Sequence, residues 1–288
     1  MQIPPNTPSS DPEQPLGGGN VPESASGSKI SLVGWIAFAV ILLGLLLPML
    51  PQTGARLIPA VFITLGFAVL ARILRGVTLS GTAAGFLVTL ILFVAFGGAM
   101  FGAVLLVFVL TYIATRFGRP RKRSLAIAER PGGRDAAQVL ANLGFAALAA
   151  ACAHLTPWSL PFLAGSIAAL AEAAGDTVSS EIGKAIAQTT RLITSGRTVP
   201  AGTDGAISVP GTLAGIIAAG FVGIEAFATG MLSFRMAIMA LVAGVLGMLF
   251  DSLLGATLER RGRLTNNGVN LISTVFAALA AILLATLS

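Results

Sequence analysis

The chain has 288 residues, of which 55% are hydrophobic and only 10% are charged, and this balance excludes a water-soluble globular protein, in which about 25% would be charged. The 18 Lys and Arg residues outnumber the 12 Asp and Glu residues, for a net charge of +6. In so apolar a chain this excess indicates basic loops beside a membrane and an anionic ligand, and no nucleic-acid partner is expected.

The chain is expected to begin with a disordered tail over residues 1–28, which hold six prolines, the run Gly17-Gly18-Gly19 and no aromatic residue. The next apolar run, 31–50, ends at Pro51-Gln52-Thr53 and not at a small-x-small cleavage site. We interpret it as a retained spanning helix. Residues 29–288 are therefore predicted to form a single transmembrane domain.

The rest of the chain alternates apolar runs with short polar connections. A spanning helix needs about 20 residues, and nine segments approach that length: 31–50, 57–74, 82–97, 99–115, 136–154, 158–177, 207–228, 234–254 and 269–287. The third and fourth are divided only by Gly97-Gly98, so a re-entrant hairpin or one bent unit is the alternative. The sequence predicts an all-α polytopic transmembrane helical bundle with eight or nine spanning helices.

Cations indicate the orientation, because Lys and Arg near helix ends are retained in the cytoplasm. With nine crossings, all of them except Arg56 and Arg235 fall on one side of the membrane. This side is predicted to hold the N-terminus and cytoplasmic loops near 116–135, 178–206 and 255–268. The pairs Gly81-x3-Gly85, Gly98-x3-Gly102 and Gly211-x3-Gly215 would allow helices to approach closely.

The densest group of ionisable residues lies at the cytoplasmic end of the sixth segment. Helical spacing puts one set of side chains on a single face, namely Glu172, Asp176, Ser179, Ser180 and Gly183. Glu181 and Lys184 form an i,i+3 pair on an adjacent face. With one cysteine, Cys152, and one histidine, His154, a zinc cluster is excluded, whereas carboxylates and hydroxyls suit Mg²⁺. The alternative is a solvated helix end with a surface ion pair.

The segment that follows, 191–212, is rich in glycine and threonine. Glycines let the backbone approach an anion closely, and the N-terminus of the next helix adds a favourable dipole. Together with Lys184, Arg191 and Arg197, this segment is interpreted as a phosphate cradle, although no Gly-Lys-Ser/Thr sequence follows the glycines as in a Walker A motif. An ordinary connecting turn is the alternative interpretation.

Other polar residues on the same side fall into two groups. We assign Asp251 and Asn270 to the site and expect Asn266 and Asn267 to cap the ninth helix. A binding surface is predicted at the start of the fifth segment, where the chain holds Arg130, Arg134, Gln138 and Asn142. Arg119 to Arg123 are explained by topology alone. His154, Trp35 and Trp158 are expected to be interfacial or packing residues.

Several of these segments together resemble the integral-membrane phytyl-phosphate kinase family, which includes the chloroplast enzyme of tocopherol synthesis and the transmembrane-protein-19 group. They are DTVSSEIG (176–183), RLIT (191–194), VPAGTDGAIS (199–208), GTLA (211–214), QVLAN (138–142), FDSLLGA (250–256) and NNGVN (266–270). The resemblance covers roughly residues 75–288. Val178 stands where the family commonly has Trp, and Glu172 lies outside the family's pattern.

The resemblance implies transfer of a phosphoryl group from CTP, or another nucleoside triphosphate, to an isoprenyl monophosphate such as phytyl or geranylgeranyl phosphate. Mg²⁺ dependence is implied by the similarity to dolichol kinases and CDP-diacylglycerol synthases. We expect Asp176, with Glu181 or Asp251, to hold Mg²⁺, and we add Glu172 from helix geometry. The substrate-binding set is Arg130, Arg134, Gln138, Asn142, Ser180, Arg191, Arg197, Gly202, Thr203, Gly205, Thr212 and Asn270, and the catalytic set is Asp176, Glu181 and Lys184.

Three other functions remain open. A CTP-dependent kinase of free prenols and a lipid cytidylyltransferase would use a similar site. An ion-coupled transporter would use Glu172, Asp176 and Asp251 as an ion path, but Glu225 alone among the intramembrane acids lies near the outer side. We expect an integral protein of the prokaryotic inner membrane with a cytoplasmic active site, and a homodimer is possible.

Overall fold

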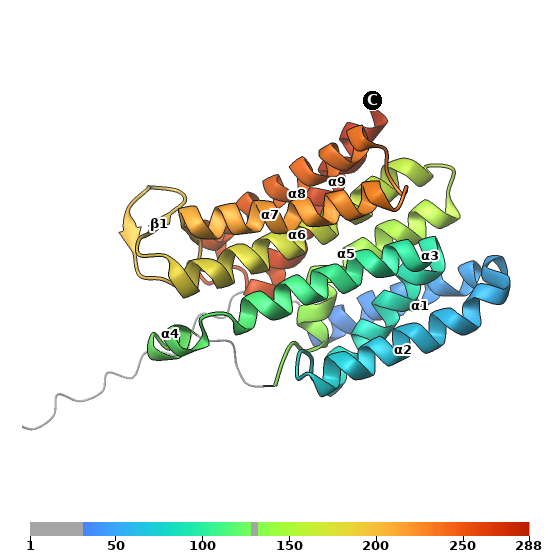
Figure 1. The fold of residues 1–288 in the computed structure, drawn as a ribbon, viewed down its shortest axis with the longest axis horizontal. Helices are drawn as coiled ribbons and strands as arrows, with labels where there is room; N and C mark the ends of the chain where they lie inside the picture. The colour runs from blue at the N-terminus through green and yellow to red at the C-terminus, as the bar shows by residue number, and fades with distance from the viewer. Residues whose placement is uncertain (1–30, 128–131, 288) are drawn as a thin grey trace, which may run out of the picture.

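The computed structural model describes residues 31–127 and 132–287, so the predicted tail over 1–28 lies outside the described residues. The described chain is almost entirely helical (Figure 1). Its elements are α1 (Leu32–Thr53), α2 (Leu57–Ile73), α3 (Leu79–Arg116), α4 (Arg119–Ser124), α5 (Ala136–Leu155), α6 (Ser159–Ile186), β1 (Thr190–Leu192), β2 (Thr198–Val199), β3 (Ala206–Ile207), α7 (Val209–Ala228), α8 (Phe234–Leu254), the π-helical turn η2 (Gly255–Glu259) and α9 (Asn266–Thr286), with a 3-10 turn, η1 (Gly54–Arg56), between α1 and α2.

The prediction of a polytopic α-helical membrane protein is confirmed. Within the described residues, six helices are long and apolar enough to cross a membrane: α1, α3, α5, α7, α8 with η2, and α9. The apolar helix α2 is shorter, with 17 residues. The 28 residues of α6 include Glu172, Asp176, Glu181 and Lys184, so this helix is less apolar than its neighbours.

The predicted third and fourth segments form two helical arms, both within α3, and the chain reverses direction between them at Gly97. Gly97 has a non-helical backbone (φ 69°, ψ −150°). Near the end of α3, Arg116 Nη2 donates to the carbonyl oxygen of Leu74 at 2.6 Å, and Leu74 precedes the start of α3. A straight helix of this length would separate the two ends by about 55 Å. The two arms of α3, before and after Gly97, therefore run antiparallel.

Helix α6 lies at the centre of the bundle and packs against α3, α5, α7, α8 and α9 (Figure 1). Small side chains allow this close packing. A Cβ atom at Gly215 would come within 2.7 Å of the carbonyl oxygen of Gly175, and one at Gly244 within 2.8 Å of Ala171 Cβ. Of the three predicted small-residue pairs, Gly211-x3-Gly215 is thus the one that brings its helix against α6.

The polar connections gather at the end of the bundle that carries α4 and the strands (Figure 1). The predicted loop 178–206 begins later than expected, because α6 continues to Ile186. The remainder of that segment forms a three-stranded antiparallel sheet in the order β2-β1-β3, with Arg191 opposite Thr198 and Ile207. The predicted loop 116–135 contains α4, and the one at 255–268 contains η2 and the start of α9.

A buried ion pair fastens α4 to α6. The Nζ of Lys122, a residue with no exposed surface, lies 2.6 Å from Glu181 Oε2 and also donates to the carbonyl oxygens of Ala114 (3.1 Å) and Thr115 (2.8 Å). Lys184 Nζ donates to the other carboxylate oxygen at 3.1 Å. All three protons of the Lys122 ammonium group thus have acceptors.

Because removal of one partner leaves an uncompensated buried charge, we expect Lys122→Met to lower the free energy of unfolding by about 3–5 kcal/mol. Lys184→Met is the matched control. Its ammonium group is partly exposed, and loss of such a pair costs about 1 kcal/mol or less. Thermal unfolding in detergent measures both variants, and equal stability of the two would contradict the structural role assigned to Lys122.

Candidate active site

A small polar cavity of about 140 Å³ lies where α6, α8, η2 and the segment 202–208 meet. We call it the carboxylate cavity. Asp176, Ser179, Ser180 and Gly183 line it from α6, and because they are spaced at i, i+3, i+4 and i+7 they share one helix face. The other lining residues are Lys184, Thr190, Gly202, Thr203, Asp204, Gly205, Ala206, Ile207, Ser208, Asp251, Ser252, Gly255, Glu259 and Asn266.

Two carboxylates face one another at this cavity. Asp176 from α6 and Asp251 from α8 both line it, close enough for their carboxyl groups to interact. Asp251 Oδ2 also accepts from Ser273 Oγ at 3.0 Å. With its amide oriented to satisfy its neighbours, Asn270 donates to Asp251 Oδ2 at 3.3 Å and accepts from Asn142 Nδ2 at 3.1 Å. Residues far apart in the sequence thus hold Asp251 in position.

Glu172, the third predicted metal ligand, lies deeper between the helices. Its side chain is 1% exposed and absent from the cavity lining, and its Oε1 atom has no hydrogen-bond partner among the described residues. No three Asp, Glu, His or Cys side chains in the described ranges are grouped to hold a metal ion. Mg²⁺ usually takes one or two protein carboxylates and fills its other positions with water and phosphate oxygens. The pair Asp176 and Asp251 fits that requirement, and the predicted set of three is not assembled.

The glycine-rich turn 202–205, which connects β2 to β3, covers one side of the carboxylate cavity. Gly205 has φ +73°, and a Cβ atom there would collide with the backbone nitrogen of Ala256 in η2. Its carbonyl oxygen accepts from Ile193 N at 3.1 Å. The surrounding protein desolvates the Asp204 carboxyl group and raises its pKa, although Arg260 and Lys184 act in the opposite direction. The lid of the cavity is therefore a tightly docked turn.

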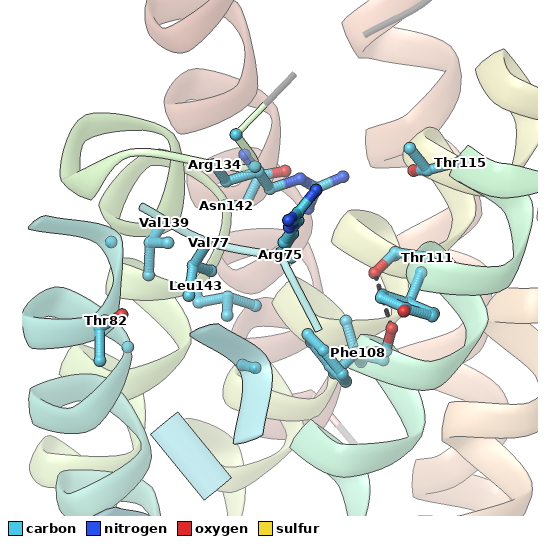
Figure 2. A pocket seen from close by; sticks show the side chains of 18 of the residues that line it. Arg75, Val77, Thr82, Phe108, Thr111, Thr115, Arg134, Val139, Asn142 and Leu143 are labelled. Carbon is cyan, nitrogen blue, oxygen red and sulfur yellow. Dashed lines mark hydrogen bonds between the residues drawn. The ribbon is translucent and has the colours of Figure 1, made fainter. Parts of the chain in front are cut away.

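A larger pocket of about 560 Å³ opens beside the carboxylate cavity, between α2, the two arms of α3 and α5. We call it the arginine pocket, because five arginines surround its mouth: Arg75, Arg116, Arg119, Arg123 and Arg134. Figure 2 shows Arg75 and Arg134 above the apolar side chains of Val77, Leu143 and Phe108. Among the described residues that line the pocket, none is acidic. The pocket therefore suits a ligand with an anionic head and an apolar body.

The arginines are held by the backbone around the mouth. Residues 132–135 pack against the turn before α3, where Arg134 N donates to Gly76 O and Thr78 N to Arg134 O, both at 3.0 Å. Arg75 has φ +56°, a conformation that L-residues other than glycine adopt at a cost and that is common at functional sites. The guanidinium of Arg116 lies 3.4 Å above the ring of Tyr112.

Two contacts connect the arginine pocket to the carboxylate cavity. Arg134 Nη2 donates at 3.2 Å to Thr177 Oγ1, and Thr177 directly follows Asp176 on α6. The second contact runs from Asn142, which lines the arginine pocket, through Asn270 to Asp251. The pocket and the cavity thus lie on either side of the C-terminal half of α6, which is predicted to carry the chemistry.

The structure gathers part of the predicted site. Asp176, Asp251, Lys184, Ser180, Gly202, Thr203 and Gly205 line the carboxylate cavity, Arg134 and Asn142 line the arginine pocket, and Asn270 joins the two. Arg130 lies outside the described residues. Several others do not line either space: Glu181, which pairs with Lys122; Gln138, whose side chain caps α5 with Asp135; Arg191, which donates to Gly196 O; and Arg197 and Thr212.

Sequence reasoning missed other lining residues. Thr265, and not Asn266, caps α9, so Asn266 is left to line the carboxylate cavity. Arg119 and Arg123, which topology alone had explained, stand at the mouth of the arginine pocket. Asp204 and Glu259 also line the carboxylate cavity. The cluster of arginines between residues 116 and 134 is the sequence feature that could have indicated the arginine pocket.

The helices and these two sites define a polytopic membrane protein with a polar site at one end of its bundle. The chain belongs to the family of integral membrane proteins DUF92, which matches residues 62–278. This membership agrees with the resemblance of its motifs to the phytyl-phosphate kinase family.

Relatives from a cyanobacterium and a plant support the assignment. The chain is 32% identical to the chloroplastic protein VTE6 of Arabidopsis thaliana over 74% of its own length and 66% of VTE6. Protein PGR of Arabidopsis thaliana is 35% identical, with 72% and 80% covered, and an uncharacterized membrane protein of Synechocystis is 35% identical, with 67% and 76% covered. No solved structure matches the chain.

Gly205→Ala should open the carboxylate cavity, because the new methyl group collides with the backbone of η2. Gly196→Ala is the matched control, since Gly196 has φ +65° but a Cβ atom there meets nothing within 4 Å, which leaves only the left-handed backbone cost of about 1–2 kcal/mol. Hydrogen exchange by mass spectrometry should accelerate at least about tenfold over both 199–208 and 255–263 in Gly205→Ala. Acceleration confined to 199–208, as in the control, would contradict the docking.

Proposed function

We propose that the protein is a CTP-dependent prenyl-phosphate kinase that transfers a phosphoryl group to an isoprenyl monophosphate, such as phytyl or geranylgeranyl phosphate, and forms the diphosphate. The observation that carries the proposal is the adjacency of two unlike sites. A pocket with five arginines and an apolar interior lies beside a cavity with two facing carboxylates and a glycine-rich turn. The resemblance of the chain's motifs to the phytyl-phosphate kinase family supports the same reaction class.

The arginine pocket would bind the acceptor. Guanidinium groups pair well with phosphate oxygens, often in a bidentate way, and the described lining of the pocket holds no acidic side chain that would repel an anion. The isoprenyl chain would then extend between the helices from the phosphate. An amphipathic lipid matches this division of polar and apolar surface.

The carboxylate cavity would bind the triphosphate of the nucleotide. Asp176 and Asp251 would hold Mg²⁺, which when bound neutralises charge on the phosphates. Lys184 and the backbone of the turn 202–205 would contact phosphate oxygens from the opposite side. The cavity volume of about 140 Å³ leaves the base and ribose outside, toward the exposed end of the bundle.

Phosphoryl transfer depends mainly on positioning and electrostatic stabilisation. The acceptor is already a phosphate monoester, so no side chain needs to act as a strong base. Arg134 lies between the two sites through its contact with Thr177. In this proposal Arg134 binds the acceptor phosphate and stabilises the charge that develops on the transferred group.

We also propose that both sites face the cytoplasm, in a prokaryotic inner membrane. Apart from Arg56 and Arg235, the cations of the described residues lie toward the end of the bundle that carries α4 and the sheet. Such an excess is retained on the cytoplasmic side. Cysteine labelling of residues in α4 and in η1 in intact cells would distinguish the two orientations.

Asp176→Asn should lower phosphoryl transfer at least about 100-fold, because it removes one of the two carboxylates that would hold the Mg²⁺ ion that neutralises phosphate charge. The assay follows labelled diphosphate formed by the purified protein from CTP, Mg²⁺ and geranylgeranyl phosphate. Glu225→Gln is the matched control, since it also removes an intramembrane carboxylate but lies near the C-terminal end of α7 and lines neither site. We expect it to retain activity.

Three results would contradict the proposal. Wild-type activity in Asp176→Asn would exclude Asp176 from the site. Release of pyrophosphate, with CMP left on the lipid, would identify a cytidylyltransferase. Absence of nucleotide-dependent product, combined with solute flux into liposomes, would identify a transporter.

A further inference from the structure

Helix α2 ends in a turn that in most proteins contains a glycine. Gly76 N donates to Ala71 O at 2.9 Å, and the N–H of Arg75 donates to Arg72 O at 3.0 Å. This pair of bonds forms a Schellman motif, in which the residue after the C-cap has a left-handed backbone and is usually glycine. That residue here is Arg75, with φ +56°. A residue with a Cβ atom adopts this conformation at a cost that glycine avoids.

The end of α7 shows the usual choice at the same position. The C-cap of α7 is Thr229, and the next residue, Gly230, has φ +75°. Its N–H donates to Phe227 O at 3.0 Å, which is the same i to i−3 bond that Arg75 makes. The turn geometry therefore favours glycine at position 75, and the arginine found there points to a role other than forming the turn.

The side chain of Arg75 makes no hydrogen bond or ion pair with the described part of the chain. It reaches over the mouth of the arginine pocket (Figure 2). Arg116 is used differently, because its Nη2 donates to Leu74 O at 2.6 Å and its guanidinium lies on the ring of Tyr112. Tyr112 also donates to Leu74 O, at 3.4 Å. Arg116 and Tyr112 thus support the turn, and the guanidinium of Arg75 is left for a ligand.

The backbone holds Arg134 beside this same turn. Arg134 N donates to Gly76 O at 3.0 Å, and a Cβ atom at Gly133 would collide with the backbone of Gly76. On the other side, a Cβ atom at Gly81 would collide with the carbonyl oxygen of Arg134. Because glycines permit close approach from both directions, the position of Arg134 is fixed relative to the turn that carries Arg75.

Two guanidinium groups on one backbone frame suit a phosphate monoester. Each presents its N–H donors in a planar fork that matches phosphate oxygens, and a phosphate monoester carries negative charge and several strong acceptor oxygens. The corresponding free alcohol has neither. It would take water from both guanidinium groups without replacing the hydrogen bonds that the water made, which is unfavourable. The pair should therefore favour a phosphorylated lipid over its alcohol.

We propose that Arg75 and Arg134 form a clamp for the phosphate of the lipid acceptor, and that Arg75 makes the pocket select the phosphorylated lipid over the free alcohol. The inference rests on the proposed function for the identity of the acceptor. It adds a substrate-binding residue and assigns the selectivity for the phosphate to it. Because Arg75 occupies a position that favours glycine, one substitution there should raise stability and lower affinity.

A neighbouring arginine provides the matched control. Arg72 lies three residues earlier in α2, is exposed and does not line the pocket. Arg72→Gln and Arg75→Gln remove the same charge from the same end of α2. Only Arg75→Gln removes it from the mouth of the pocket.

The first test is binding of geranylgeranyl phosphate and of geranylgeraniol to the full chain, without nucleotide, in nanodiscs of phosphatidylcholine. The wild type should bind the phosphate at least about tenfold more tightly than the alcohol. Arg75→Gln should lose at least about tenfold in affinity for the phosphate and at most about twofold for the alcohol. Arg72→Gln should match the wild type for both lipids.

The second test is thermal unfolding in the same nanodiscs without either ligand. Arg75→Gly should raise the midpoint by about 2 °C, because it removes the cost of the left-handed backbone, and it should lose phosphate affinity as Arg75→Gln does. Gly230→Arg is the reverse exchange. It should lower the midpoint by about the same amount, because it introduces that cost at a turn that lines neither site.

Unchanged phosphate affinity in Arg75→Gln would overturn the proposal, as would an equal loss for the phosphate and the alcohol. A lower midpoint in Arg75→Gly would show that the arginine serves the fold, and would also overturn it. Because no nucleotide is present in the binding test, phosphate selectivity that depends on Arg75, without any phosphoryl transfer, would sustain this inference and overturn the proposed function. Phosphoryl transfer with an unchanged KM for geranylgeranyl phosphate in Arg75→Gln would do the reverse.

Discussion

The placement of carboxylates inside an apolar bundle is the constraint on which the rest of this structure depends. Helix α6 carries Glu172, Asp176 and Glu181 through the centre of the molecule, where an unpaired charge costs several kcal/mol. Their environments differ. Glu181 pairs with Lys122 of α4, Asp176 lies at one cavity with a second carboxylate, Asp251 of α8, and Glu172 Oε1 has no hydrogen-bond partner among the described residues.

Polar contacts also fix the packing around α6. The residue types on α6 are small, and glycines of α7 and α8 let those helices approach its backbone. Small residues alone would allow the helices to slide along one another, since dispersion contacts are not directional. The contacts of Glu181 with Lys122 and of Thr177 with Arg134 remove that freedom, because each has one register in which donor and acceptor meet. The geometry of the two sites follows from this register.

The sequence predicted the helices well and their polar contacts less well. The thickness of a bilayer sets the length of a spanning apolar run, and these runs predicted most helix bounds to within about three residues. The glycines at 97 and 98 marked the reversal in α3. Glu181 shows the limit. It lies five residues after Asp176, about 140° around the helix, and its partner Lys122 is 59 residues away, so no local pattern could reveal the pair. The short strands β1 to β3 are likewise held by contacts between segments.

The arginines illustrate a different limit. Arg119 and Arg123 follow the same pattern as loop cations that only set orientation, and what distinguishes them is a pocket formed by α2, α3 and α5 together. Gln138 shows the reverse case, because its position at the start of α5 fitted a binding role and its side chain caps the helix instead. In both cases residue type and position along the chain suggested the wrong role. Only the tertiary packing shows which of these residues line a pocket.

The charges of the two sites are segregated in a way that matters for any reaction between two anions. At an effective dielectric constant of 20, two unit charges 4 Å apart interact by about 4 kcal/mol, so two phosphates brought together repel strongly unless cations lie between them. The described lining of the arginine pocket holds no acid, whereas that of the carboxylate cavity holds four: Asp176, Asp204, Asp251 and Glu259. An anionic head is thus drawn to the arginines and repelled from the carboxylates unless a cation accompanies it. A phosphate in the arginine pocket and a cation-bound phosphate in the carboxylate cavity would therefore each have one favourable site, and the contact of Arg134 with Thr177 lies on the boundary between them.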